Sequence, residues 1–84
     1  MMGNSNTIQP LVKQHINIPQ LLSIKDVSRY TGLSRSTIYE LINEKSYRYD
    51  PNFPKKVQLT RGRVAWVADE VAQWISSKIE ARVR

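Results

Sequence analysis

The sequence predicts a mainly α-helical fold that carries one small β-hairpin. Three observations support this prediction. Two short segments with apolar residues at helical spacing are separated by a glycine, a second glycine divides two short β-branched segments, and a further amphipathic segment follows. With 84 residues, the chain has room for one domain. It contains no cysteine, which excludes disulfides and thiolate zinc sites.

The first helix is expected within residues 23–31. Ser23 is a suitable N-cap, and Asp26 three residues later resembles the partner residue of a capping box. Gly32 is expected to end this helix, because glycine readily adopts the left-handed conformation found after helix C-termini.

A second helix is expected to begin after Ser34, its N-cap, and to run to about Glu44. Ile38, Leu41 and Ile42 would form its inward face. Because only a tight glycine turn separates the two helices, the pair is predicted to be a helix-turn-helix.

The rest of the chain predicts a loop, a hairpin and a third helix. Residues 45–54 contain two prolines and are expected to form a loop. Residues 56–59 and 64–67 alternate in polarity and flank Gly62, which predicts a β-hairpin. Residues 68–84 have the spacing of an amphipathic helix. This order predicts a winged helix-turn-helix with a recognition helix, a two-stranded wing and a C-terminal helix.

Aromatic and apolar side chains of the C-terminal half are assigned to the core. Trp66 lies in the second hairpin segment, and Trp74 and Ile79 lie on the apolar stripe of the third helix. A core this small needs the area of its aromatic rings, so neither tryptophan is expected to stack on bases. Asp69 is expected to cap the third helix.

The charge of the chain indicates a polyanionic partner. The net charge is +6 and the pI is about 10.0. Residues 55–63 hold four bases and no acid. These bases are Lys55, Lys56, Arg61 and Arg63. We expect the two wing arginines to lie on DNA phosphates or to enter a narrow minor groove, and the two lysines to hold the DNA backbone. The alternative is that this charge serves only solubility.

The start of the second helix lacks an acid, although helix N-termini favour negative charge. Its polar residues are Ser34, Arg35, Ser36 and Thr37. Such a helix end is suited to a phosphate or a guanine edge. Arg35 can pair with guanine, and Asn43 on the expected outward face can pair with adenine. Tyr39 can reach a phosphate or a thymine methyl, with a half-buried supporting role as the alternative.

Enzymatic, metal and cofactor roles are not expected. The chain has no Ser/His/Asp set and no glycine-rich phosphate loop, and its only histidine, His15, lies in a polar segment. No run of 18 apolar residues or targeting signal occurs, so a cytoplasmic location is expected. Residues 1–20 are expected to be a flexible arm, and residues 21–82 the DNA-binding domain.

The chain resembles the AlpA family of small prophage-linked regulators, which is related to MerR-type helix-turn-helix proteins and phage excisionases. The resemblance covers roughly residues 21–80 and rests on SIKDVSRYTGLSRSTIYELI, FPKKVQL, RVAWV and DEVAQWI. It implies a winged helix-turn-helix that binds DNA without a cofactor. It also implies DNA contacts at positions 34–37, at Tyr39 and at the wing residues Arg61 and Arg63. The segment KSYRYDPN is longer here than in many family members.

We therefore expect a nucleoid-associated protein that binds double-stranded DNA sequence-specifically. It is expected to regulate a prophage or genomic island, and an excisionase role is one form of this function. An integrase or another regulator is a candidate protein partner, and the protein is expected to be a monomer or to assemble weakly and cooperatively on DNA. One alternative is a protein-interaction module that binds a recombinase or response regulator through the helix-turn-helix surface. Binding of the third helix to a membrane surface is disfavoured, because the core needs its apolar stripe.

Overall fold

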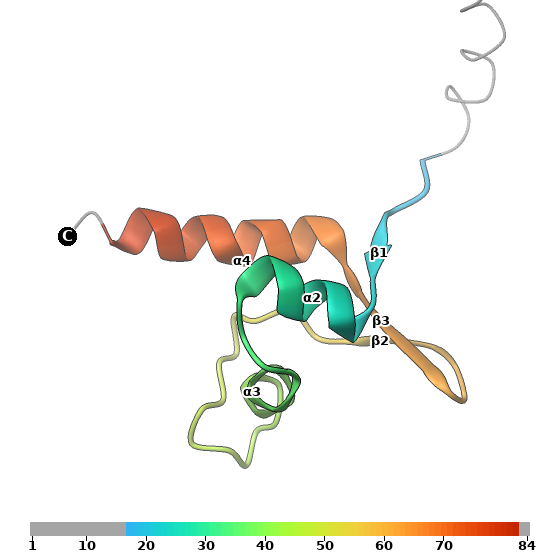
Figure 1. Ribbon diagram of the computed structural model, residues 1–84, viewed down its shortest axis with the longest axis horizontal. Coiled ribbons are helices and arrows are strands. Elements are labelled where there is room, and N and C mark those ends of the chain that lie inside the picture. The colour runs from blue at the N-terminus through green and yellow to red at the C-terminus, as the bar shows by residue number, and fades with distance from the viewer. Residues whose placement is uncertain (1–16, 83–84) are drawn as a thin grey trace, which may run out of the picture.

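The computed structural model describes residues 17–82, which hold three helices and three short strands. In chain order the elements are β1 (Leu21–Leu22), α2 (Ile24–Thr31), α3 (Arg35–Leu41), β2 (Val57–Thr60), β3 (Arg63–Val67) and α4 (Ala68–Ala81). In Figure 1, α2 lies between α3 and α4, and the β2–β3 hairpin projects to one side. Most of the predicted N-terminal arm, and the last two residues of the predicted third helix, lie outside the described residues.

Helix α2 has the two ends that its sequence predicts. The Ser23 hydroxyl accepts a hydrogen bond from the Asp26 N–H, and the Asp26 carboxylate accepts one from the Ser23 N–H, which confirms the capping box. Gly32 follows the helix with a φ of 77°, and its N–H donates to the Ser28 carbonyl at 2.8 Å. This is the left-handed C-terminal conformation that the glycine predicted.

The strands form an antiparallel sheet in the order β1-β3-β2. Val57 pairs with Ala65 in the hairpin, which confirms that the two alternating segments pair. Leu22 pairs with Trp66 on the other side of β3, so the predicted two-stranded element is part of a three-stranded sheet. Strand β1 was not predicted, because two leucines are too few to show a strand period and their partner is distant in sequence.

Helix α4 continues directly from β3. Its N-cap is Val67, which makes no side-chain capping bond, and the prediction that Asp69 caps this helix is wrong. The Ala68 N–H donates instead to the Gln20 carbonyl at 2.9 Å. This backbone hydrogen bond satisfies one of the N–H groups at the helix start, which a capping side chain would otherwise satisfy. Asp69 lies within the first turn, where its charge still favours the helix N-terminus.

The core lies where the three helices meet the sheet. Its buried members are Leu22, Val27, Ile38, Phe53, Trp66 and Val71. No polar or charged residue is buried among residues 17–82. Trp66 is fully buried, which confirms its assignment to the core, and Trp74 is partly buried against the same cluster. Ile79 departs from the prediction, because 48% of it is exposed.

Candidate nucleic-acid interface

Hydroxyl groups fix the turn between α2 and α3. The Ser28 hydroxyl donates to the Leu33 carbonyl at 2.6 Å, and the Leu33 N–H donates to the Thr31 hydroxyl at 3.2 Å. The Thr31 hydroxyl in turn donates to the Val27 carbonyl at 2.8 Å. With the fully buried Ile38 anchoring α3 from the other side, these bonds hold α3 in one orientation on α2. Sequence analysis missed them, although small hydroxyl residues beside a glycine turn were a visible signal.

The first turn of α3 presents polar groups to solvent and contains no acid. The Ser34 hydroxyl accepts a hydrogen bond from the Thr37 N–H at 3.1 Å and donates to the Thr37 hydroxyl at 2.9 Å. Both side chains therefore stabilise the helix end itself. Arg35 and Ser36 are exposed and have no side-chain hydrogen bond to the described residues, so they are the groups at this end that are free to bind a ligand.

Helix α3 is shorter than predicted. It ends at Leu41, with Ile42 as its C-cap, so the expected extension to about Glu44 is wrong. The Asn43 side-chain oxygen accepts a hydrogen bond from the Lys45 N–H at 3.0 Å, and such local bonding competes with helix continuation. Asn43 is therefore exposed in a turn and does not share a helical face with Arg35.

Tyr39 is partly packed on the core and partly exposed, so its supporting role is confirmed and its contact with DNA stays a prediction. Its ring meets Trp66 edge to face, with the ring centroids 6.1 Å apart, while 41% of the residue is exposed. One edge of the ring thus supports α3 on the core, and the rest faces solvent beside the first turn of the helix.

The hairpin carries exposed cations on a separate element. Arg61 and Arg63 are exposed at its tip. The strand pairing is irregular between Gln58 and Thr60, and the Gln58 amide donates to the Thr60 carbonyl at 2.7 Å. Lys55 and Lys56 are exposed just before β2. None of these four cations forms an ion pair with any residue in the described range 17–82.

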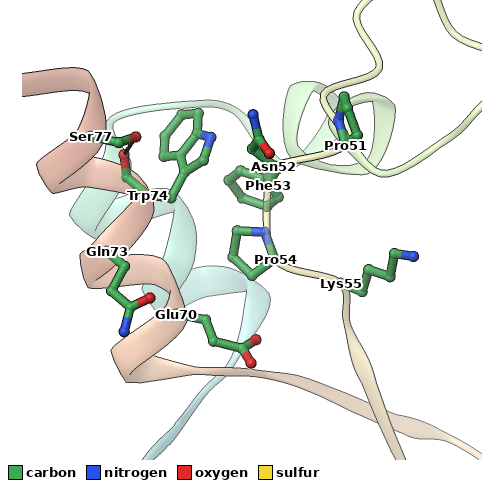
Figure 2. A pocket seen from close by; sticks show the side chains of 9 residues that line it. All are labelled: Pro51, Asn52, Phe53, Pro54, Lys55, Glu70, Gln73, Trp74 and Ser77. Carbon is green, nitrogen blue, oxygen red and sulfur yellow. Dashed lines mark hydrogen bonds between the residues drawn. The ribbon is translucent and has the colours of Figure 1, made fainter. Parts of the chain in front are cut away.

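The long loop between α3 and β2 is anchored to α4 through Asp50. The Trp74 indole N–H donates to one Asp50 carboxylate oxygen at 3.1 Å, and the Trp74 ring meets Phe53 edge to face with centroids 4.8 Å apart. Figure 2 shows the Trp74 ring beside Phe53, with Pro54 next along the loop and Lys55 pointing away from α4. These residues line an open hollow of about 520 Å³ between the loop and α4. This anchor, which sequence analysis missed, fixes the chain that leads into the hairpin.

The Asp50 carboxylate is kept ionised by its surroundings. Partial burial raises its pKa, but the N–H groups of Asn52 and Trp74 and the charge of Lys78 at 3.7 Å outweigh that effect. The pKa of Asp50 therefore lies below its ordinary value.

The loop also contacts α3. The Arg48 guanidinium lies 2.7 Å from the Glu40 carboxylate and stacks over the Tyr47 ring, 5.2 Å from its centroid. Both charged side chains are about half exposed, so this pair contributes little stability. It does occupy Glu40, a residue whose position on α3 would otherwise allow it to face a base.

Residues 17–82 contain no group of three or more acids and histidines placed to hold a metal ion. Within the same range, no helix has the length and apolar character needed to cross a bilayer.

Comparisons with known proteins identify a family. A family model described as the prophage CP4-57 regulatory protein (AlpA) matches residues 20–79. The DNA-binding transcriptional activator AlpA of Escherichia coli K12 is 41% identical over 59 residues, which cover 70% of this chain and 84% of that protein. An uncharacterized protein, ORF88 of Enterobacteria phage P4, is 40% identical over 65 residues, which cover 77% of this chain and 67% of the phage protein. No solved structure matches significantly.

Proposed function

The chain belongs to the AlpA family, and from this premise and the geometry of α3 we propose that it is a winged helix-turn-helix regulator that binds duplex DNA sequence-specifically. One observation carries the proposal. The exposed first turn of α3 has a free arginine and no acid, on a helix that hydroxyl bonds and a buried isoleucine hold in one orientation. A rigid helix with this end exposed is suited to reading base edges in the major groove.

The first turn of α3 and the basic residues of the hairpin would contact different parts of the DNA. Arg35, Ser36 and Tyr39 would contact bases or nearby phosphates, and the capping residues Ser34 and Thr37 would present the N–H groups of the helix end to a phosphate. The cations at 55, 56, 61 and 63 would hold the DNA backbone, because no described acid neutralises them. Asn43, which lies in the turn after α3, would contact the backbone and not a base.

The relatives support a more specific role in gene regulation. One relative is named as a transcriptional activator and another comes from a phage, which supports action on the genes of a prophage or genomic island. A basic hairpin that bends DNA would also suit an excisionase, with an integrase or another regulator as protein partner. The protein would act without a cofactor or catalytic activity, as part of the nucleoid, either as a monomer or in a weak cooperative assembly on DNA.

The salt dependence of binding tests the proposal. A duplex recovered from a random pool by repeated selection with the protein provides a specific site, and a scrambled duplex of equal length is the control. Anisotropy titrations at increasing salt should give a log–log slope near −0.9 for each phosphate neutralised, which corresponds to a slope of about −3.6 if four cations engage. Failure to enrich any sequence, together with no binding at low salt, would refute the proposal and favour a protein-interaction module.

A further inference from the structure

A second surface lies away from the polar face of α3. Two adjoining hollows run along the side of α4 that faces α2, and Tyr30 and Ile75 line both of them. We call this surface the α4 groove and define it by Leu22, Tyr30, Ala68, Ala72, Ile75 and Ile79. In Figure 1, α4 and α3 lie on opposite sides of α2. The residues that line the two hollows include none of α3.

The α4 groove has a buried floor and an exposed apolar rim: Leu22 belongs to the core, Ala68 and Ile75 pack partly buried against it, and Tyr30, Ala72 and Ile79 are exposed. Tyr30 is 60% exposed and Ile79 is 48% exposed, and neither belongs to the buried core. An apolar surface that is continuous over two hollows is typical of an interface with another macromolecule.

The spacing of residues along α4 indicates another helix as the occupant. Ala68, Ala72, Ile75 and Ile79 are separated by four, three and four residues, which is the spacing of a seam between paired helices. If a second α4 runs antiparallel, Ala68 can lie opposite Ile79 of the second copy, and Ala72 opposite its Ile75. Each small residue then faces a large one, whereas parallel pairing would set alanine against alanine and isoleucine against isoleucine.

The charges of α4 favour the same arrangement. Its first turn carries the two acids Asp69 and Glu70, whereas Lys78, Glu80 and Arg82 at its other end sum to a charge of +1. Neither Asp69, Glu70 nor Arg82 forms an ion pair with residues 17–82. Antiparallel pairing brings the acidic end of each helix beside the basic end of the other, whereas parallel pairing brings like charges together.

We propose that the α4 groove binds α4 of a second copy of this chain in antiparallel orientation, so that two copies form a symmetric pair. The contact would be weak in solution, because about twelve residues overlap over roughly 18 Å. On DNA it would produce cooperativity, since neighbouring sites raise the effective concentration of one copy near the other. This consequence rests on the proposed DNA-binding function, and it predicts that paired half-sites are inverted.

Self-association of the full 84-residue chain tests the contact without DNA. Sedimentation equilibrium should show a concentration-dependent dimer, and Ile79→Glu should weaken it at least about tenfold by placing a charge in the seam. Leu59→Glu is a matched control, because Leu59 is also 48% exposed but lies in the hairpin, and it should leave the dimer unchanged. If the wild-type protein is strictly monomeric and Ile79→Glu lowers its melting temperature, Ile79 packs against residues of its own chain. That result would overturn the proposal.

A charge reversal tests the orientation. Asp69→Lys and Arg82→Glu should each weaken the dimer, and the double variant should restore it, with circular dichroism verifying that all variants fold. A double variant no better than the single ones would overturn the antiparallel arrangement.

Binding to DNA separates this inference from the proposed function. Ile79→Glu should bind a duplex with one site as wild type does, and should lose cooperativity on a duplex with two inverted sites. Wild-type binding to both duplexes without cooperativity would refute the dimer and leave the DNA-binding function standing.

Discussion

Removing the Asp50 carboxylate should detach the long loop from α4 and destabilise the protein measurably. Its oxygens accept hydrogen bonds from the Asn52 N–H at 2.8 Å and the Trp74 indole at 3.1 Å, and only 19% of the side chain is exposed. Hydrogen bonds to a charged group contribute about 1.5–3 kcal/mol each, but their effects overlap. Lys78 is 58% exposed, so its ion pair adds less than about 1 kcal/mol. We expect Asp50→Ala to cost about 2–4 kcal/mol.

This cost would be a large fraction of the stability of so small a domain, which should be about 3–10 kcal/mol. Urea unfolding followed by circular dichroism at neutral pH measures it. Asp50→Asn is the matched control, because it keeps an acceptor oxygen but loses the charge, and it should fall between wild type and Asp50→Ala. If Asp50→Ala unfolds within about 0.5 kcal/mol of wild type, the loop is not anchored by this carboxylate.

The effect of Asp50 should depend on pH in one direction. Because the pKa of Asp50 is lower in the folded protein than in the unfolded chain, its stabilising contribution is complete above the ordinary aspartate value of about 3.9. The contribution disappears as the pH falls through the lowered folded value. The difference in unfolding free energy between wild type and Asp50→Ala should therefore be constant near neutrality and shrink only below about pH 4.

Five further substitutions separate structural from DNA-contacting roles. Trp74→Ala should cost roughly 3–5 kcal/mol and leave the chain largely unfolded by circular dichroism, because the ring packs on Phe53 and its indole holds Asp50; a folded variant would contradict this. Gly32→Ala should cost about 1–2 kcal/mol in urea unfolding, because its φ of 77° strains any side chain. Arg35→Ala should lose about 1–3 kcal/mol of specific affinity in anisotropy titrations and flatten preference at one base pair, with unfolding free energy unchanged or slightly raised. Arg61→Ala and Arg63→Ala should instead weaken specific and scrambled duplexes about equally and reduce the salt slope.

The sequence predicted those elements whose signals lie within a few residues of one another. Ser23, Asp26 and Gly32 determine both ends of α2 through local bonds, and their geometry agrees with the prediction. The antiparallel hairpin of β2 and β3 was likewise predicted, because a short turn joins the two strands.

The features that sequence analysis missed depend on contacts between distant segments. Strand β1 exists only because Leu22 pairs with Trp66, and the same pairing supplies the carbonyl that replaces a cap at the start of α4. The anchor between Asp50 and Trp74 joins residues that are 24 positions apart. No local pattern encodes which distant partner a short apolar segment or a loop carboxylate will meet.

At the start of α3, local sequence and side-chain bonding together determine which residues are free to bind DNA. The sequence marked positions 34–37 as one polar group, and the structure divides it. Ser34 and Thr37 bond to each other and complete the helix end, which leaves Arg35 and Ser36 with free polar atoms. A change at Ser34 would therefore alter DNA binding through the position of the whole helix, whereas a change at Arg35 would act on the bound base alone. For this reason unfolding stability must be measured beside affinity for every variant at this end of α3, because affinity by itself cannot separate a lost contact from a displaced helix.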